Sequence, residues 1–163
     1  MRVYVPSTLA LLARWHTDGS VPATAAHAVT PALREWYTSG DAEELEYAAL
    51  LEAAEASLHL LATDPDAPRR RVVVATEVAD AAVRRGNGAR SAVTVDDVGL
   101  DAVASVHVDD ADASHDVAAA VAALPAASAG DDDAQFTVDG ADAHDLLWYD
   151  ATEIRTLLPP PSS

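Results

Sequence analysis

Residues 41–63 read DAEELEYAALLEAAEASLHLLAT, the longest uninterrupted helical pattern in the sequence. Asp41 is placed to cap the backbone N–H groups of the first turn, and Glu44 three residues later completes a capping-box pair. Apolar side chains then recur every three or four residues, which predicts a helix with one buried face. The residues that we expect on that face are Leu51, Ala54, Leu58 and Leu61. At about 1.5 Å per residue the helix spans roughly 30 Å, so the remaining elements are expected to pack along it.

The segment before this helix is predicted to hold a strand and two shorter helices. MRVYV alternates and is rich in β-branched residues, which predicts a strand over residues 2–5 that ends at Pro6. A capping serine or threonine then starts a helix that ends at Gly19. The pair Thr30-Pro31 is a specific helix start, and that helix is expected to pack Leu33, Trp36 and Tyr37 on the long one.

The segment after the long helix alternates strands with one helix. Residues 69–78, RRRVVVATEV, contain a continuous apolar run, which favours a central strand covered on both faces. The other expected strands are 92–95, 103–108, 136–138 and 146–149. A helix from residue 114 is expected to stop at Pro125, and the small, acidic residues 126–134 are predicted to be mobile.

Without the short segments 92–95 and 136–138, the predicted elements follow the order β, α, helical hairpin, β, β, α, β. Without the helical hairpin, this is the order of a ferredoxin-like split βαβ fold. We predict a single α+β domain over residues 1–158 with a mixed β-sheet, followed by a disordered tail at 159–163. A doubly wound α/β arrangement is the alternative.

The composition limits the chemistry and the location of the protein. The chain has 163 residues and no cysteine, which excludes disulfides, thiolate metal sites and cysteine nucleophiles. No apolar run approaches the roughly 18 residues of a membrane span, and the first residues do not resemble a signal peptide. We therefore expect a cytoplasmic protein that does not bind membranes.

The formal net charge of −17 is concentrated in the second part of the chain. Residues 1–90 contain nine arginines and twelve carboxylates, whereas residues 91–163 contain one arginine and fifteen carboxylates. Such a surface repels nucleic acid and favours a basic protein as partner. The first functional hypothesis is therefore a non-enzymatic interaction or regulatory protein. A GC-rich coding bias or an adaptation to salt produces the same composition without a partner.

The alternative hypothesis is an enzyme that depends on a divalent metal or handles phosphate. It would use the strand-to-helix loop at residues 109–116, because ligands commonly bind at the carboxyl ends of strands. Carboxylates and an imidazole there offer ligands for Mg²⁺ or Mn²⁺. The candidate ligands are Asp109, Asp110, Asp112 and His115. The same residues are equally interpretable as helix caps and dipole partners.

A second candidate site is the loop RRGNGAR, residues 84–90, which follows the triplet RRR at residues 69–71. Its two glycines would let backbone N–H groups approach a phosphate. Arg84, Arg85 and Arg90 would then supply the charge for anion binding. No P-loop lysine and no GxGxxG motif is present, and a flexible hairpin loop explains the same residues.

Four segments resemble a family of small, acidic actinobacterial proteins recorded only as a domain of unknown function. They are the start MRVYVPSTL, the segment AVTPALREWYTSGDAEELEYAAL, the strand VASVHVDDAD and the closing LLWYDATEI. The resemblance covers most of the chain. It implies no activity, ligand or catalytic residue.

Overall fold

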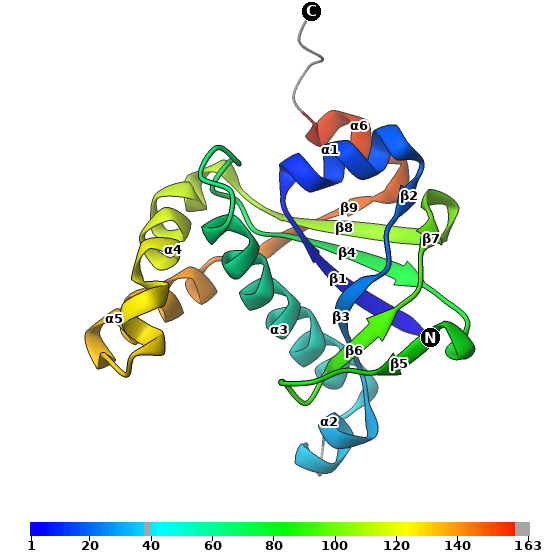
Figure 1. Cartoon of the computed structure of the whole chain (residues 1–163), viewed down its shortest axis with the longest axis horizontal. Coiled ribbons are helices and arrows are strands. Elements are labelled where there is room, and N and C mark those ends of the chain that lie inside the picture. The colour runs from blue at the N-terminus through cyan, green and yellow to red at the C-terminus, as the bar shows by residue number, and fades with distance from the viewer. Residues whose placement is uncertain (38–39, 159–163) are drawn as a thin grey trace, which may run out of the picture.

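Seven strands form one antiparallel sheet in the computed structural model, which describes residues 1–37 and 40–158. Their order across the sheet is β5-β6-β3-β1-β4-β8-β9 (Figure 1). In chain order these strands are β1 (Arg2–Ser7), β3 (Thr24–Ala28), β4 (Val72–Glu77), β5 (Val83–Arg85), β6 (Ala92–Val95), β8 (Val103–Asp109) and β9 (Leu146–Asp150). A separate two-stranded ribbon pairs β2 (Ser20–Val21) with β7 (Val98–Gly99).

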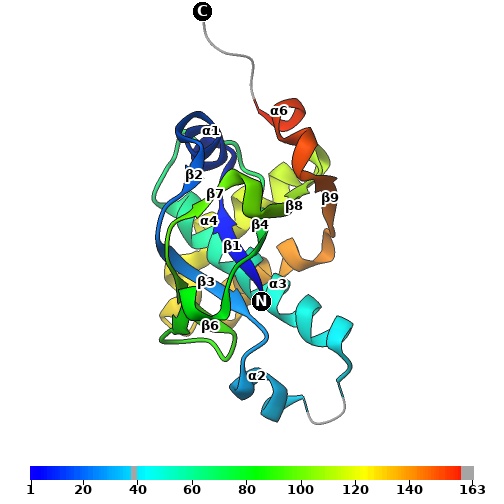
Figure 2. The same cartoon turned by 90° about the vertical axis from the view of Figure 1, so that its right-hand side faces the viewer.

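Helices cover both faces of this sheet. The α-helices are α1 (Leu9–Asp18), α2 (Pro31–Trp36), α3 (Ala42–Ala62), α4 (Ser114–Ser128), α5 (Asp132–Asp139) and α6 (Ile154–Leu157). Short 3₁₀ turns occupy Asp80–Ala82, Leu100–Ala102, Ala111–Ala113, Gly140–Ala143 and Ala151–Glu153. Helices α1 and α6 pack on one face through Leu12, Trp15 and Ile154, and α3 packs on the other. Helices α4 and α5 extend sideways from α3 (Figures 1 and 2).

The prediction of an α+β domain is confirmed, but the predicted mixed sheet is wrong. Every ladder is antiparallel. Strand β4 begins beside the end of β1, with Ser7 opposite Val72, so the chain runs back along its first strand. Because β1 pairs directly with β4, and β8 with β9, the sheet lacks the interleaved order of a ferredoxin-like fold. Antiparallel pairing also excludes the doubly wound alternative.

The predicted helix starts are confirmed by their caps. The side chains of Thr8, Thr30 and Asp41 accept hydrogen bonds from backbone N–H groups three residues later, at the starts of α1, α2 and α3. Gly19 ends α1 with a φ of 78°, which is the left-handed conformation that glycine adopts most easily. Strand β1 continues through Pro6 to Ser7, so Pro6 does not end it.

The buried face of α3 differs from the predicted one. Ala54, Leu58 and Leu61 are buried as expected, whereas Leu51 is 37% exposed. The helix instead presents a face rich in small residues to the sheet, formed by Leu45, Ala49, Ala53, Ala54 and Ser57. Small side chains let a helix approach its neighbour closely, so the alanines on this helix mark the contact. Strand β4 is central and buried, as its apolar run predicted.

The predictions for residues 125–138 are wrong. Helix α4 continues through Pro125 to Ser128, because its buried face of Val117, Ala120, Val121 and Leu124 outweighs one lost helical hydrogen bond. Residues 132–139 form α5 instead of a mobile segment and a strand. Asp131 caps α5 by accepting hydrogen bonds from the N–H groups of Asp133 and Ala134. The tail predicted at 159–163 lies outside the described residues.

Within residues 1–37 and 40–158, none of the helices combines the length and the apolar character that crossing a membrane requires.

Candidate functional site

Asp109, the central residue of the predicted metal site, forms a buried ion pair. Both Asp109 and Arg71 are almost completely inaccessible to solvent. The Arg71 Nε and Nη2 atoms donate to the two carboxylate oxygens of Asp109 at 2.9 and 2.8 Å. The backbone N–H of Arg71 donates to the same carboxylate at 2.7 Å. The carboxylate is therefore occupied by protein donors and is closed to a metal ion in this arrangement.

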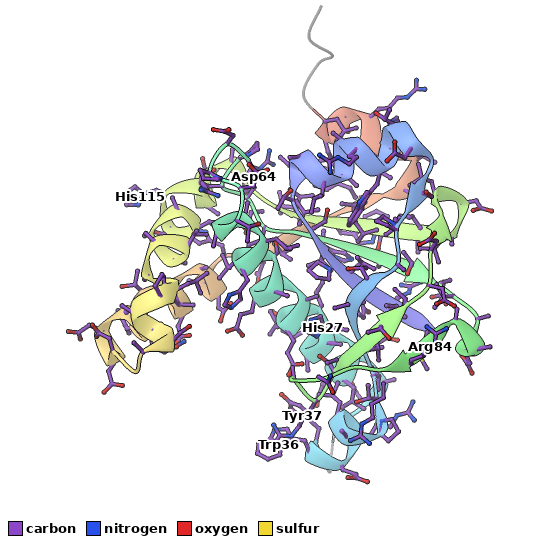
Figure 3. All side chains as sticks on the ribbon, in the orientation of Figure 1. His27, Trp36, Tyr37, Asp64, Arg84 and His115 are labelled. Atoms are coloured by element: carbon purple, nitrogen blue, oxygen red, sulfur yellow. The ribbon has the colours of Figure 1, made fainter. Side chains whose placement is uncertain are left out.

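The other predicted ligands lie apart on the surface. Asp110 caps a 3₁₀ turn by accepting a hydrogen bond from the N–H of Asp112. The side chain of His115 is 95% exposed and lies at the outer edge of α4 (Figure 3). A hydrogen bond with the His144 ring, at 2.7 Å, holds the pKa of Asp116 below its usual value. In the described parts of the chain, no group of three or more His, Cys, Asp or Glu could hold a metal ion. The geometry gives the predicted Mg²⁺ or Mn²⁺ site no support.

The three arginines predicted to bind an anion, in contrast, line one groove. It lies between the β5–β6 hairpin and the start of α2, with a volume of about 880 Å³. Arg84, Arg85 and Arg90 line it together with Asn87 and Glu35. We call this feature the arginine groove.

Two glycines shape the hairpin that forms one wall of the arginine groove. The N–H of Gly86 donates to the carbonyl of Ala92 at 3.0 Å. A Cβ atom at Gly86 would lie 2.9 Å from the backbone of Ala92 and Val93, so only glycine fits. Gly88 has a φ of +105°, a conformation that other residues rarely adopt. The backbone path of the RRGNGAR loop therefore depends on its two glycines.

The arginines differ in how they are held. The Arg90 guanidinium stacks on the Trp36 ring at 3.6 Å from the ring centroid, and the Thr30 hydroxyl donates to the Arg90 carbonyl. Arg84 pairs with Asp96 at 2.8 Å. Arg85 has no carboxylate within ion-pair distance among the described residues. One arginine is thus fixed by stacking, one is paired at the surface, and one is available to a ligand.

The predicted packing of Trp36 on α3 is wrong. Trp36 is 61% exposed, because its side chain lies at the outer end of α2, where its ring stacks with Arg90 (Figure 3). Tyr37 is also exposed, whereas Leu33 alone from this segment is fully buried against α3.

A hydrogen-bonded cluster that the sequence did not reveal anchors the end of the loop. The buried hydroxyl of Ser91 donates to Glu52 on α3 and lies 2.7 Å from the Nδ1 atom of His27 on β3. Because the Ser91 proton goes to Glu52, the Nδ1 atom of His27 is the donor to Ser91. The carboxylate contacts the serine, and the hydroxyl is inaccessible to solvent, so the cluster positions the loop and is not arranged as a nucleophilic triad.

We expect a pH dependence of stability from two half-buried histidines. Burial lowers the pKa of His27, which Glu52 partly opposes, and burial lowers the pKa of His107. The unfolded chain therefore takes up protons near the ordinary histidine pKa of about 6.5, before the folded chain does. The free energy of unfolding is expected to fall as the pH is lowered from about 7.5 through that value.

Urea denaturation at several pH values tests this expectation. The double variant His27→Gln and His107→Gln should show a flatter dependence over this range, and His115→Gln, at an exposed position, should follow the wild type. Equal slopes in the wild type and the double variant would contradict it.

A family model matches residues 1–158, and it is described as a family of unknown function, DUF6912. The chain belongs to the DUF6912 family. The predicted resemblance to an uncharacterised family is thereby confirmed. No curated protein and no solved structure matches the chain. The DUF6912 description names no activity for its members.

Proposed function

We propose that the protein binds a phosphorylated small molecule in the arginine groove. The observation that carries this proposal is the meeting of Arg84, Arg85 and Arg90 in one groove of a chain whose net charge is −17. A cluster of positive charge inside an acidic surface concentrates anions at that one place. The volume of about 880 Å³ suits a ligand the size of a nucleotide.

The arginines are suited to phosphate oxygens. A guanidinium group presents a planar fork of N–H donors that matches two oxygens of a phosphate. Stacking on Trp36 holds Arg90 in one orientation, which lowers the entropy lost when a ligand binds. The Arg84–Asp96 pair is exposed, and such pairs contribute about 0–1 kcal/mol, so Arg84 can exchange Asp96 for a ligand at little cost.

The residues that line the arginine groove also indicate the orientation of a bound ligand. Glu35 lies on α2 and would repel a phosphate beside it, whereas Arg84 and Arg85 lie on the hairpin. The Arg90 guanidinium reaches from the hairpin to the Trp36 ring. Val29, Pro31 and Ala32 line the groove near α2 and offer apolar contact. We therefore place the phosphates at the hairpin and an apolar or flat body of the ligand against the start of α2.

Calorimetry with ADP, with pyrophosphate as a second probe, tests the proposal. ADP at 100 times its dissociation constant should raise the free energy of unfolding by about 2.7 kcal/mol, because it binds only the folded chain. Arg85→Glu is expected to weaken binding at least tenfold, since it reverses the charge of the arginine without a carboxylate partner. Arg14→Glu, an exposed arginine on α1, makes the same charge change away from the groove. No binding of either probe at millimolar concentration, or an equal loss in both variants, would refute the proposal.

A further inference from the structure

Strand β9 is an edge of the seven-stranded sheet, and it exposes two large apolar side chains. Trp148 is 61% exposed and Leu147 is 40% exposed. Figure 2 shows β9 at the outer margin of the sheet, below α6. Neighbouring side chains of a strand point to opposite faces, so these two side chains lie on either side of the edge. Exposed edges with large apolar side chains are places where another strand adds.

The backbone of β9 offers hydrogen-bonding groups on its outer side. The N–H of Asp109 on β8 donates to the Arg71 carbonyl, toward β4. Because these groups alternate along a strand, Val108 faces β9 and pairs with Leu147. The N–H and C=O groups of Leu146 and Trp148 consequently point outward, and no partner strand covers them in the described chain.

The charge around β9 specifies the chemistry of an added strand. Asp145 precedes the strand, Asp150 ends it, and Glu153 follows one turn later. These residues belong to the part of the chain that has one arginine against fifteen carboxylates. A basic segment is attracted to such an edge, whereas a second copy of a chain with a net charge of −17 is repelled.

We propose that β9 is the docking edge for an extended, basic segment of a partner protein. The segment adds to the sheet as a further strand and bonds to the outward groups of Leu146 and Trp148. Its apolar side chains pack on Trp148 on one face of the edge, and its arginines or lysines lie on the other face, beside Leu147 and Asp145. Recognition by strand addition combines main-chain hydrogen bonds for affinity with side-chain contacts for specificity. Strand addition at β9 does not depend on ligand binding in the arginine groove.

The probe is a hexapeptide of alternating arginine and valine, with fluorescence anisotropy as the readout. Its control carries the same side chains but has alternate backbone nitrogens methylated, which blocks strand pairing and keeps the charge. Trp148→Ala is compared with Phe136→Ala, which removes an aromatic ring that is 81% exposed on α5. Thermal unfolding of both variants is expected to stay close to wild type, because substitutions of exposed side chains usually change stability little.

We expect the hexapeptide to bind the wild type and the Phe136→Ala variant equally. Trp148→Ala, and methylation of the peptide, should each weaken binding at least tenfold, and bound peptide should slow hydrogen exchange at Leu146 and Trp148. Absence of binding would overturn the proposal. Equal binding of the methylated peptide, or equal binding to Trp148→Ala, would do so too, because it would reflect charge alone. An oligomer of the wild type that Trp148→Ala dissociates would overturn the proposal as well, because a second copy of the chain would then occupy the edge.

Discussion

Replacing Asp109 by asparagine is expected to lower the free energy of unfolding by about 3–5 kcal/mol, because it leaves the buried Arg71 guanidinium with no buried counter-charge. The side chain of Arg71 is 1% exposed and that of Asp109 is 0% exposed. Water therefore cannot replace the lost carboxylate. The nearest remaining acid is Asp142, whose carboxylate lies 3.5 Å from Arg71 and is 59% exposed.

The exposed pair Arg84–Asp96 is a matched control for this experiment. Its N–O distance of 2.8 Å equals that of Arg71–Asp109, but its side chains are 63% and 50% exposed. Asp96→Asn is expected to change stability by at most about 1 kcal/mol. Urea denaturation of both variants gives the comparison, and a similar small loss in both would show that burial does not govern the Arg71–Asp109 pair. Replacing both members of the buried pair by leucine should recover part of the loss, since no unpaired charge remains.

This pair also shows why the sequence of the strand-to-helix loop at 109–116 is ambiguous between a metal site and a structural ion pair. Consecutive carboxylates after a strand are compatible with either role, and the decisive partner, Arg71, lies 38 residues earlier. Arg71 also donates to the carbonyl of His144 at 2.8 Å, so it joins β4, β8 and the approach to β9. A long-range pairing of this kind is set by strand order, which local patterns do not determine.

Local signals predicted the elements that depend on local chemistry. The capping residues Thr8, Thr30 and Asp41 marked three helix starts because each satisfies backbone N–H groups within its own first turn. Asp131 caps α5 in the same way, but the small and acidic residues around it are also typical of a mobile segment, so the cap is not evident from the sequence. The buried face of α3 was harder to predict because alanines occupy several sides of the helix. Which of them is buried depends on what the helix packs against.

The proximity of Arg84, Arg85 and Arg90 was predictable for a similar reason, because all three belong to one hairpin. The groove itself also depends on α2, which lines its other side. The cluster of His27, Glu52 and Ser91 joins residues 39 and 64 positions apart, and no spacing in the sequence indicates it. Trp36 likewise contacts Arg90 only because α2 folds against the hairpin.

Replacing Leu58 by alanine is expected to lower the free energy of unfolding by about 2–5 kcal/mol, because the change removes buried apolar surface and leaves a cavity. Leu58 is 2% exposed and belongs, with Leu61 of α3, to the cluster that holds α4 and α5. That cluster includes Val117, Val121 and Leu124 of α4. The loss should therefore loosen the attachment of α4 and α5, which hydrogen exchange along α4 would register as faster opening.

Leu51→Ala removes the same side-chain atoms as Leu58→Ala, but from another face of α3, where the side chain is 37% exposed. Less apolar surface is lost there, and water fills the space that the side chain leaves, so the expected change is below about 1 kcal/mol. Helix propensity is altered equally in the two variants, which leaves burial as the difference between them. If urea denaturation gave the same loss for both, the packing of α3 against α4 would not be the stabilising contact that the structure indicates.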